Sequence, residues 1–276
     1  MSDHDEQRGL ADVSAGTSAV GNAGLPLEQA VHSSARNELL SAAGDPTLTA
    51  DLALALLKRA DLPGVVIEEL AKNRALVKLR QVKIALASHA QAPRHVSVPL
   101  IRQFYTFDLM KVALSPLVPA DVKRAADETL LNRLATTTQG ERLTLARQGS
   151  GRIAGALLLD VEARIMRAAL ENARLTEALV VRAVLKPDAG SALIHAVAQH
   201  AKWSCRRDVQ VALLGTECLS LARALAFARA ISGPRLREIL QTSRLPQRIK
   251  DQLMHEKPPV AGTTRLNGQA GYNSAH

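Results

Sequence analysis

Aromatic residues are scarce in this chain of 276 residues, which contains one Trp, two Tyr and three Phe. Its apolar residues, 47% of the total, are mainly Ala, Leu, Val and Ile. A β-sandwich or β-barrel is built from aromatic and β-branched runs, and these are missing here. The even spread of apolar residues argues against a wholly disordered chain. The composition therefore predicts an all-α protein.

Cysteine is equally rare, since only Cys205 and Cys218 occur. Two cysteines provide neither a disulfide framework nor a zinc site of the usual ligand spacing. Residues 1–34 carry five acidic residues against one Arg, and they contain no apolar run, which does not match a signal peptide. No uncharged stretch reaches the roughly 18 apolar residues of a membrane span. From these absences we expect a cytoplasmic protein without a membrane span.

Charge is distributed unevenly along the chain. The whole chain carries +9, residues 1–34 carry −4 and residues 258–276 carry +1, which leaves +12 for residues 35–257. A basic balance favours association with acidic proteins or nucleic acid and does not specify a fold. The acidic segment 1–34 and the segment 258–276 are rich in small and polar residues. We expect both to be disordered tails, with a short helix near residues 25–32.

An internal repeat organises the chain between these tails. A shift of 127 residues aligns residues 42–123 with residues 169–250 without a gap, and 15 of the 82 aligned positions are identical. Chance would give roughly half that number in a chain so rich in Ala and Leu. Many mismatches exchange one apolar residue for another, as expected when a core is kept. This predicts a first helical-repeat copy at 35–123, a helical connector at 124–168 and a second copy at 169–257.

Helix starts recur within each copy, where an apolar residue is followed by Thr, Pro or Ser, as in Leu48-Thr49 and Val118-Pro119. Ser and Thr accept a hydrogen bond from the first turn of a helix, and Pro suits the first helical position. The predicted helices, such as one over 176–185, have about ten to fourteen residues, and helices that short are marginal alone. Successive pairs must therefore stack on one another. The predicted fold is an all-α solenoid of stacked short helix pairs with an internal duplication.

Three runs in the second copy carry a resemblance to known proteins: ALENARLT at 169–176, VVRAVL at 180–185, and Lys202-Trp203 followed by 209–213. They resemble a family of uncharacterised bacterial helical-repeat proteins, HEAT-like or leucine-rich-repeat-variant-like, over about residues 35–257. In that family the turn before a helix often reads Asn-Pro-x-Thr-Pro, of which SHAQAP at 88–93 keeps only the final Pro and GTECLS at 215–220 keeps nothing. The resemblance implies a superhelical scaffold and supplies no activity.

Three pairs of basic residues recur at the same spacing, and they are the predicted partner-binding residues: Arg80 and Arg207, Arg102 and Arg229, and Lys123 and Lys250. A charge repeated with the fold could form a basic ridge that binds an acidic helix, an extended acidic segment or a phosphate backbone. The same residues could form a solvated surface whose long side chains cover apolar stems.

The glycine-rich run GSGRIAG at 149–155 superficially resembles a phosphate-binding loop. Such loops follow a strand and continue with a Lys-Ser/Thr or a correctly placed third glycine, and none of these is present. We interpret the run as a flexible turn between helices. The histidines show no metal-ligand spacing on a helix face, so no metal site is predicted.

The aromatic residues Phe104, Tyr105 and Phe107 could stack a base beside a neighbouring arginine. Filling of the core is the simpler expectation for three aromatic residues at a helix end. Trp203 aligns with Leu76 at the repeat spacing, and we expect it to pack in the core as well.

Two functions of different class remain open, beside a third, a lyase-like or chaperone-like protein that attaches a cofactor to another protein, for which no residue gives evidence. The first is a noncatalytic protein-interaction scaffold, without a cofactor, that binds an acidic or extended partner on a basic solenoid face. The alternative is a nucleic-acid-binding HEAT-like solenoid, either a DNA binder or a relative of base-excision enzymes. An excision enzyme needs an acidic catalytic residue flanked by aromatic residues, which the composition disfavours. The identity of the partner and the oligomeric state stay open.

Overall fold

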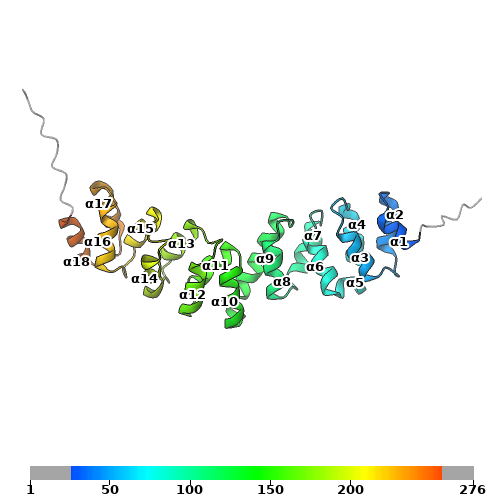
Figure 1. Cartoon of the computed structure of the whole chain (residues 1–276), viewed down its shortest axis with the longest axis horizontal. Helices are drawn as coiled ribbons and strands as arrows, with labels where there is room; N and C mark the ends of the chain where they lie inside the picture. Colours follow the sequence, from blue (N-terminus) through cyan, green and yellow to red (C-terminus); the bar gives the residue numbers. More distant parts are fainter. Residues whose placement is uncertain (1–25, 257–276) are drawn as a thin grey trace, which may run out of the picture. The chain divides into compact units, whose positions relative to one another are not determined.

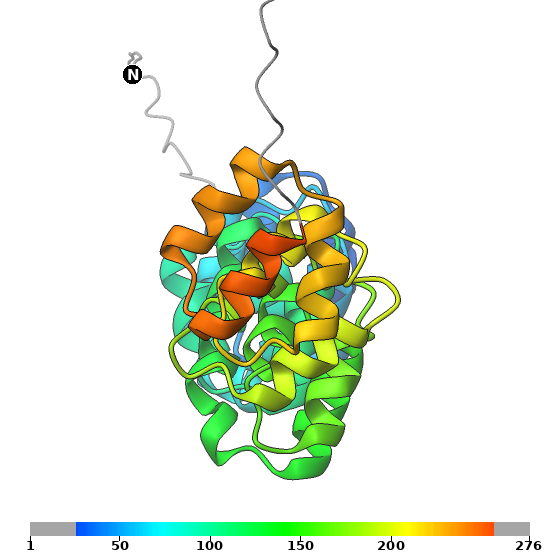
Figure 2. The same ribbon diagram turned by 90° about the vertical axis from the view of Figure 1, so that its left-hand side faces the viewer.

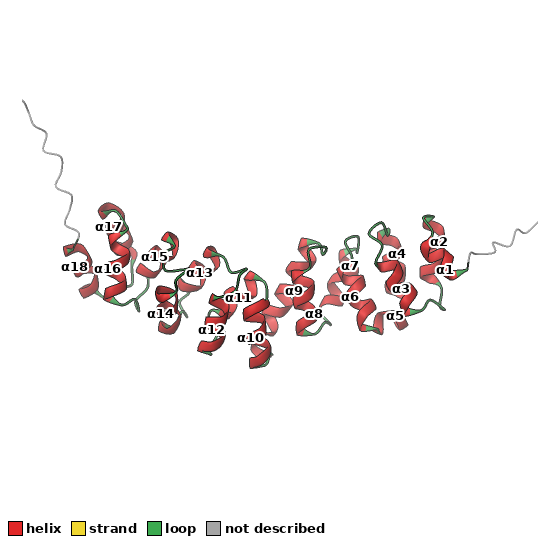
Figure 3. Cartoon of the chain, viewed as in Figure 1, coloured by secondary structure: helices red, strands yellow, loops and turns green. Residues whose placement is uncertain are grey.

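The computed structural model describes residues 26–256, and every regular element within that range is helical (Figures 1 and 3). The α-helices are α1 (Leu27–His32), α2 (Arg36–Gly44), α3 (Ala50–Leu57), α4 (Gly64–Lys72), α5 (Arg74–Lys78), α6 (Arg80–Ser88), α7 (Arg94–Ile101), α8 (Thr106–Leu114), α9 (Ala120–Arg133), α10 (Gln139–Gln148), α11 (Gly151–Leu157), α12 (Ala163–Leu170), α13 (Glu177–Val184), α14 (Ser191–Gln199), α15 (Arg207–Leu214), α16 (Leu221–Arg229), α17 (Gly233–Thr242) and α18 (Gln247–His255). A 3₁₀ helix, η1 (Leu134–Thr136), follows α9.

Most of these helices have eight or nine residues, which is shorter than the predicted ten to fourteen. The short helix expected near residues 25–32 is α1, and its Val31 is fully buried. The array therefore already includes α1, which lies inside the segment predicted to be the N-terminal tail. The remaining tail predictions, for residues 1–25 and 257–276, lie outside the described residues.

The chain divides into two compact units, Met1–Val82 and Lys83–His276, and the boundary falls within α6. In the first unit α1 packs on α2 and α3, while α4 packs on α2 and α5. Its core consists of fully buried aliphatic side chains: Val31, Leu56, Leu62, Val66, Ile67 and Leu70. Aliphatic packing between short helices, each marginal alone, holds this unit together.

In the second unit the packing follows the order of the chain. Helices α7, α9, α11, α13, α15 and α17 form one row in which each helix contacts the next. A second row consists of α10, α12 and α14, and α16 contacts α18. Figure 2 views this unit from its C-terminal end, with the last helices in orange and red at the front. The protein is thus all-α, with short helices packed sequentially in a repeat-like array.

The predicted helix starts are confirmed, because each is the N-cap of a helix: Thr49, Pro63, Pro93, Pro119, Thr176, Ser220 and Pro246. Thr49 precedes α3 and accepts a hydrogen bond from the Leu52 backbone N–H at 3.4 Å. Pro63 and Pro93 precede α4 and α7. These prolines were expected at the first helical position, and they lie one residue earlier, at the N-cap, with φ of −62° and −61°. Proline fits there because its φ is already fixed near this value and the N-cap N–H belongs to no helical hydrogen bond.

Helix starts recur with the spacing found in the sequence. Seven pairs of helices begin 127 residues apart: α2 and α12, α3 and α13, α4 and α14, α6 and α15, α7 and α16, α8 and α17, and α9 and α18. Helix α5 is the exception, because residues 201–205 form turns instead. Burial follows the same spacing, since Leu76 and Trp203 are both buried, as are Phe104 and Ile231.

Side-chain hydrogen bonds in three turns recur with this spacing as well. In each turn a side chain accepts a hydrogen bond from the backbone N–H two residues later, at 2.7–3.1 Å. The pairs of accepting residues are Ser33 and Asp160, Asp45 and Asn172, and Asn73 and His200. Such local bonds give backbone N–H groups in the turns a partner outside the helices. Different side chains with one acceptor role thus occupy equivalent positions.

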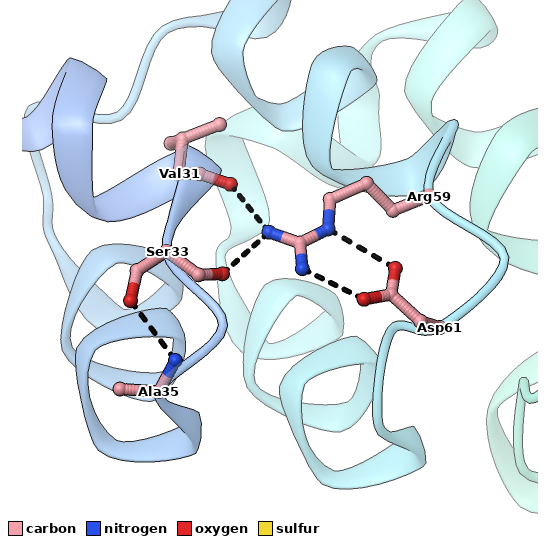
Figure 4. A network of polar contacts seen from close by, with 5 residues as sticks. All are labelled: Val31, Ser33, Ala35, Arg59 and Asp61. Carbon is pink, nitrogen blue, oxygen red and sulfur yellow. Dashed lines mark hydrogen bonds and ion pairs between the residues drawn. The ribbon is translucent and has the colours of Figure 1, made fainter.

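Helix C-termini receive donors from residues 23–33 positions later in the chain. The Arg59 guanidinium donates to the carbonyl oxygens of Val31 and Ser33, at 3.0 and 2.6 Å, while its other nitrogens bind the Asp61 carboxylate (Figure 4). In the second unit, Asn172 Nδ2 donates to the Ala146 carbonyl at 2.8 Å. These bonds satisfy carbonyl groups that a helix end leaves without a partner, and they link one helix pair to the next.

The glycine-rich run is a turn between α10 and α11, as predicted, but it is tightly packed. A Cβ on Gly149 would lie 2.4 Å from the Leu145 carbonyl oxygen, and one on Gly151 would lie 2.4 Å from that of Arg174. Ser150 between them accepts a hydrogen bond from the Ile153 N–H. The prediction of a flexible turn was therefore wrong about the role of the glycines, which permit close approach of two backbone segments.

The aromatic residues divide into core and surface. Phe104 is buried, as expected. Tyr105 is 72% exposed and Phe107 is 39% exposed, so the prediction of core filling was wrong for these two. Tyr105 forms the N-cap of α8 and Phe107 lies in its first turn, next to the buried Asp108. Trp203 is buried as predicted, and its Nε1–H donates to the Leu170 carbonyl at 2.9 Å.

Candidate functional site

A hollow in the second unit lies over α15, between α13 and α17. We call it the large hollow; its volume is about 1000 Å³. Its lining comprises Glu177, Ala178, Val181, Leu185, Asp208, Val211, Ala212, Gly215, Arg235, Glu238, Ile239, Thr242 and Arg244. The α15 residues are spaced three or four apart, so they form one stripe along that helix. Their small side chains make a low floor, and α13 and α17 form the walls.

The surface of the large hollow combines apolar and charged groups. Leu185 is 50% exposed on one wall. Glu177 and Asp208 lie in the first turns of their helices, where a carboxylate is stabilised by the positive end of the helix dipole. Arg235 binds Glu238 at 2.5 Å on the opposite wall. The large hollow therefore presents an apolar floor with an acidic edge, and it is not basic.

A second hollow lies along the same row, between α9, α11 and α13. We call it the basic hollow; its volume is about 330 Å³. It is lined by Leu131, Arg152, Gly155, Ala156, Leu179, Arg182, Ala183 and Lys186. Arg152 stands 3.8 Å from Glu128, a weak surface pair. Three cations around one hollow create a positive potential there.

Helix α13 separates these two hollows. Successive residues of an α-helix are turned by about 100°, so its side chains can be assigned to flanks. Buried Val180 and Val184 face the core. One flank lines the large hollow with Glu177, Ala178, Val181 and Leu185, and the other lines the basic hollow with Leu179, Arg182, Ala183 and Lys186. The two hollows are thus neighbours on the outward side of one row of helices.

The second row carries a third hollow of about 470 Å³, which we call the arginine hollow. Its lining is Arg147 from α10 together with Arg164, Arg167, Ala168 and Glu171 from α12 and its end. It lies in the part of the chain predicted to be a connector and in the adjoining start of the second copy.

The predicted arginines all lie at helix ends and are exposed. Arg80 and Arg207 are the first residues of α6 and α15. Arg102 follows the last residue of α7. Arg229 ends α16 and stands 3.9 Å from Glu256. Equivalent positions therefore have equivalent places on their helices.

The two predicted lysines are half-buried. Lys250 donates from Nζ to the Ser243 carbonyl at 2.7 Å, so it stabilises the end of α17. Lys123 lies in α9, in the row that runs to α17, whereas Lys250 lies in α18. None of the six predicted residues lines the large, basic or arginine hollow. Arg229 lines a smaller hollow of about 160 Å³ together with Glu256. The basic ridge stays a prediction.

Metal and membrane sites were also considered for the described residues. Within residues 26–256 no three side chains of His, Cys, Asp or Glu gather into a group that could hold a metal ion. Over the same range no helix is both long and apolar enough to span a bilayer. The two cysteines are free, Cys205 at the surface and Cys218 half-buried.

The hollows were not predicted from the sequence, because the candidate residues were charges that recur at the 127-residue spacing and the acidic residues lining the large hollow do not recur. At the 127-residue spacing Glu177, Asp208 and Glu238 align with Ala50, Gln81 and Lys111. The acidic edge therefore belongs to the second copy alone. A signal was present in the sequence, namely the small residues of α15 at a spacing of three to four, but small residues also occur at ordinary helix contacts.

Comparison of the chain with protein-family models, with curated proteins and with solved structures finds no match. The comparisons therefore assign no family, and the resemblance to HEAT-like proteins rests on the residues given above.

Proposed function

We propose that the protein is a noncatalytic interaction scaffold: a HEAT-like α-solenoid with an internal duplication that binds an extended polypeptide along one row of helices. The duplication is supported by the 127-residue spacing of seven helix starts and of three turn hydrogen bonds. Independent convergence on one spacing at both levels is improbable, whereas a duplicated ancestor produces it directly.

The large hollow carries the functional part of the proposal. Its floor on α15 is largely apolar and lies between α13 and α17, which suits the side chains of a bound segment. The basic hollow beside it would accept a carboxylate on the same segment, because Arg182 and Lys186 are exposed and can donate charge-assisted hydrogen bonds. The partner we propose is thus an extended segment in which acidic residues adjoin apolar ones. This keeps the acidic, extended character expected from the sequence and moves its binding site away from the predicted ridge.

Selection of peptides from a displayed random library on the full chain tests this proposal. We expect enriched peptides to combine an acidic cluster with two or three apolar residues. Their binding should be weakened at least tenfold by Ala178→Trp, which fills the large hollow, and by the double charge reversal Arg182→Glu with Lys186→Glu.

Matched controls come from the same chain. Ala222→Trp places the same bulk at an exposed position of α16, and Arg206→Glu with Arg237→Glu reverses the same charge away from the hollows. We expect both controls to bind the selected peptides as the wild type does. Failure to enrich any peptide, or equal losses in variant and control, would contradict the proposal.

Nucleic-acid binding is the alternative function, and a DNA-binding assay distinguishes it from peptide binding. If phosphate contacts dominated, affinity for random duplex DNA would fall about 10³-fold or more between 50 and 200 mM salt for roughly six neutralised phosphates. We expect no retarded band at low salt at protein concentrations that bind the selected peptides. A salt-sensitive band that the double charge reversal abolishes would favour the nucleic-acid function instead.

A further inference from the structure

The arginine hollow is lined by three cations and one anion, the Glu171 carboxylate. Arg147, Arg164 and Arg167 are exposed and line the same hollow of about 470 Å³. Among residues 26–256 none of the three forms an ion pair, and Oε1 of Glu171 shares a hydrogen bond of 3.1 Å with Nε2 of His200. Three guanidinium groups are therefore available to a ligand.

The fold gives no reason for this arrangement. Arg164 lies in the first turn of α12, where the helix dipole disfavours a cation. Arg164 and Arg167 are three residues apart on one helix, so their like charges repel each other. At the 127-residue spacing they align with Asn37 and Leu40, so the equivalent helix forms without them. An unfavourable cluster that the fold does not need is expected where an anion binds.

We propose that the arginine hollow binds a terminal phosphoryl group, a dianion with three non-bridging oxygens. Each guanidinium presents a planar fork of donors that matches two such oxygens. A carboxylate has two oxygens and is satisfied by one arginine, and an internal phosphodiester carries one negative charge. Three forks around one hollow therefore match a phosphomonoester best. This site lies on the row of α10 and α12, and it does not depend on the proposed function of the α13, α15 and α17 surface.

Titration of the ¹⁵N-labelled full chain followed by NMR tests the assignment, with inorganic phosphate and a Gly-phosphoserine-Gly peptide as probes. We expect saturable shifts of arginine Nε–Hε signals and of backbone amides at 145–149 and 163–171. Stronger binding of the peptide than of phosphate identifies a modified polypeptide as the source of the group, and the reverse identifies a small phosphorylated molecule. Affinity should rise with pH through about 6, as the second proton of the phosphoryl group leaves.

The variants separate this site from general charge. Arg147→Ala with Arg164→Ala and Arg167→Ala should weaken binding at least tenfold, while circular dichroism shows an unchanged helix content, since alanine favours helices. The matched triple variant Arg206→Ala, Arg237→Ala and Arg248→Ala removes three exposed arginines elsewhere and should bind as the wild type does.

Three results would overturn the assignment. One is equal weakening by both triple variants. Another is binding of the unphosphorylated Gly-Ser-Gly peptide as strong as that of the phosphorylated one. The third is displacement of the phosphopeptide by an oligonucleotide without a terminal phosphate at the same concentration as by one that carries it. Replacement of all three by lysine tests the fork geometry: undiminished affinity would overturn the guanidinium assignment.

Discussion

Trp203 offers the sharpest test of how the array is held together. Its ring is 2% exposed, its Nε1–H donates to the Leu170 carbonyl at the end of α12, and Lys202 Nζ lies 4.2 Å from its ring centroid. Trp203→Ala removes the ring and the donor together and should lower the free energy of unfolding by about 3–5 kcal/mol. A domain is stable by only about 5–15 kcal/mol, so this change would remove a large share of the total.

Trp203→Leu separates packing from hydrogen bonding. Leucine keeps an aliphatic side chain at this buried position, as at the aligned Leu76, which lies in α5 whereas Trp203 lies in a turn. The Leu170 carbonyl would still lose its donor, and we expect a loss of about 1–3 kcal/mol. Lys202→Ala, which removes only the cation above the ring, should cost less than about 1 kcal/mol.

Urea denaturation followed by circular dichroism measures these differences. Tryptophan fluorescence cannot follow the two Trp203 variants, because Trp203 is the single tryptophan of the chain. In the wild type its emission should shift to longer wavelength as the chain unfolds. If the free energy of unfolding of Trp203→Ala lay within about 0.5 kcal/mol of the wild-type value, as for an ordinary surface substitution, Trp203 would not stabilise the array as described.

Three further predictions concern polar groups. Asn172→Ala removes a buried donor to the carbonyls at the end of α10 and should lower the free energy of unfolding by about 2 kcal/mol in the same assay. Burial raises the pKa of Asp127, so its charged form destabilises the fold at pH 7. Asp127→Asn, which can still accept a hydrogen bond from Ser150, should therefore raise the thermal midpoint at pH 7, and this gain should disappear in melts below pH 3.8. A lower midpoint of the variant at pH 7 would contradict this prediction. Hydrogen bonds from Arg59 lower the pKa of Asp61. The stabilising effect of the Asp61 carboxylate should be complete above pH 3.8 and be lost as the pH falls through the pKa of Asp61 in the folded state. Thermal melts of Asp61→Asn should lack this pH-dependent fall in the midpoint.

The helical architecture could be predicted because its signals are local. Apolar spacing and the Thr, Pro and Ser residues before helices mark each start within a few positions, and a gap-free offset ties the two copies together. The exposed Tyr105 and Phe107 were mispredicted because hydrophobicity does not report which side of a helix start faces solvent. The tightness of the turn at Gly149 and Gly151 depends on the Leu145 and Arg174 carbonyls, and the latter comes from a distant segment.

The hollows could not be predicted for a similar reason. The large hollow and the basic hollow are each formed by three helices, and the arginine hollow is formed by two. In each case another helix lies between these helices along the chain. Pairing of Arg229 with Glu256, and of Lys250 with the Ser243 carbonyl, likewise arises from packing between helices. Recurrence of a charge at the repeat spacing identifies equivalent positions on the fold, and it gives no information on whether those positions meet.

Hydrogen exchange of the full chain, with and without a peptide selected from the library, shows whether an extended polypeptide binds along the row of α11, α13, α15 and α17. Binding along the proposed row should slow exchange in α11, α13, α15 and α17, and it should leave α10, α12, α14, α16 and α18 unchanged. Protection confined to the latter helices, or spread evenly over residues 26–256, would contradict the assignment of this row as the binding surface.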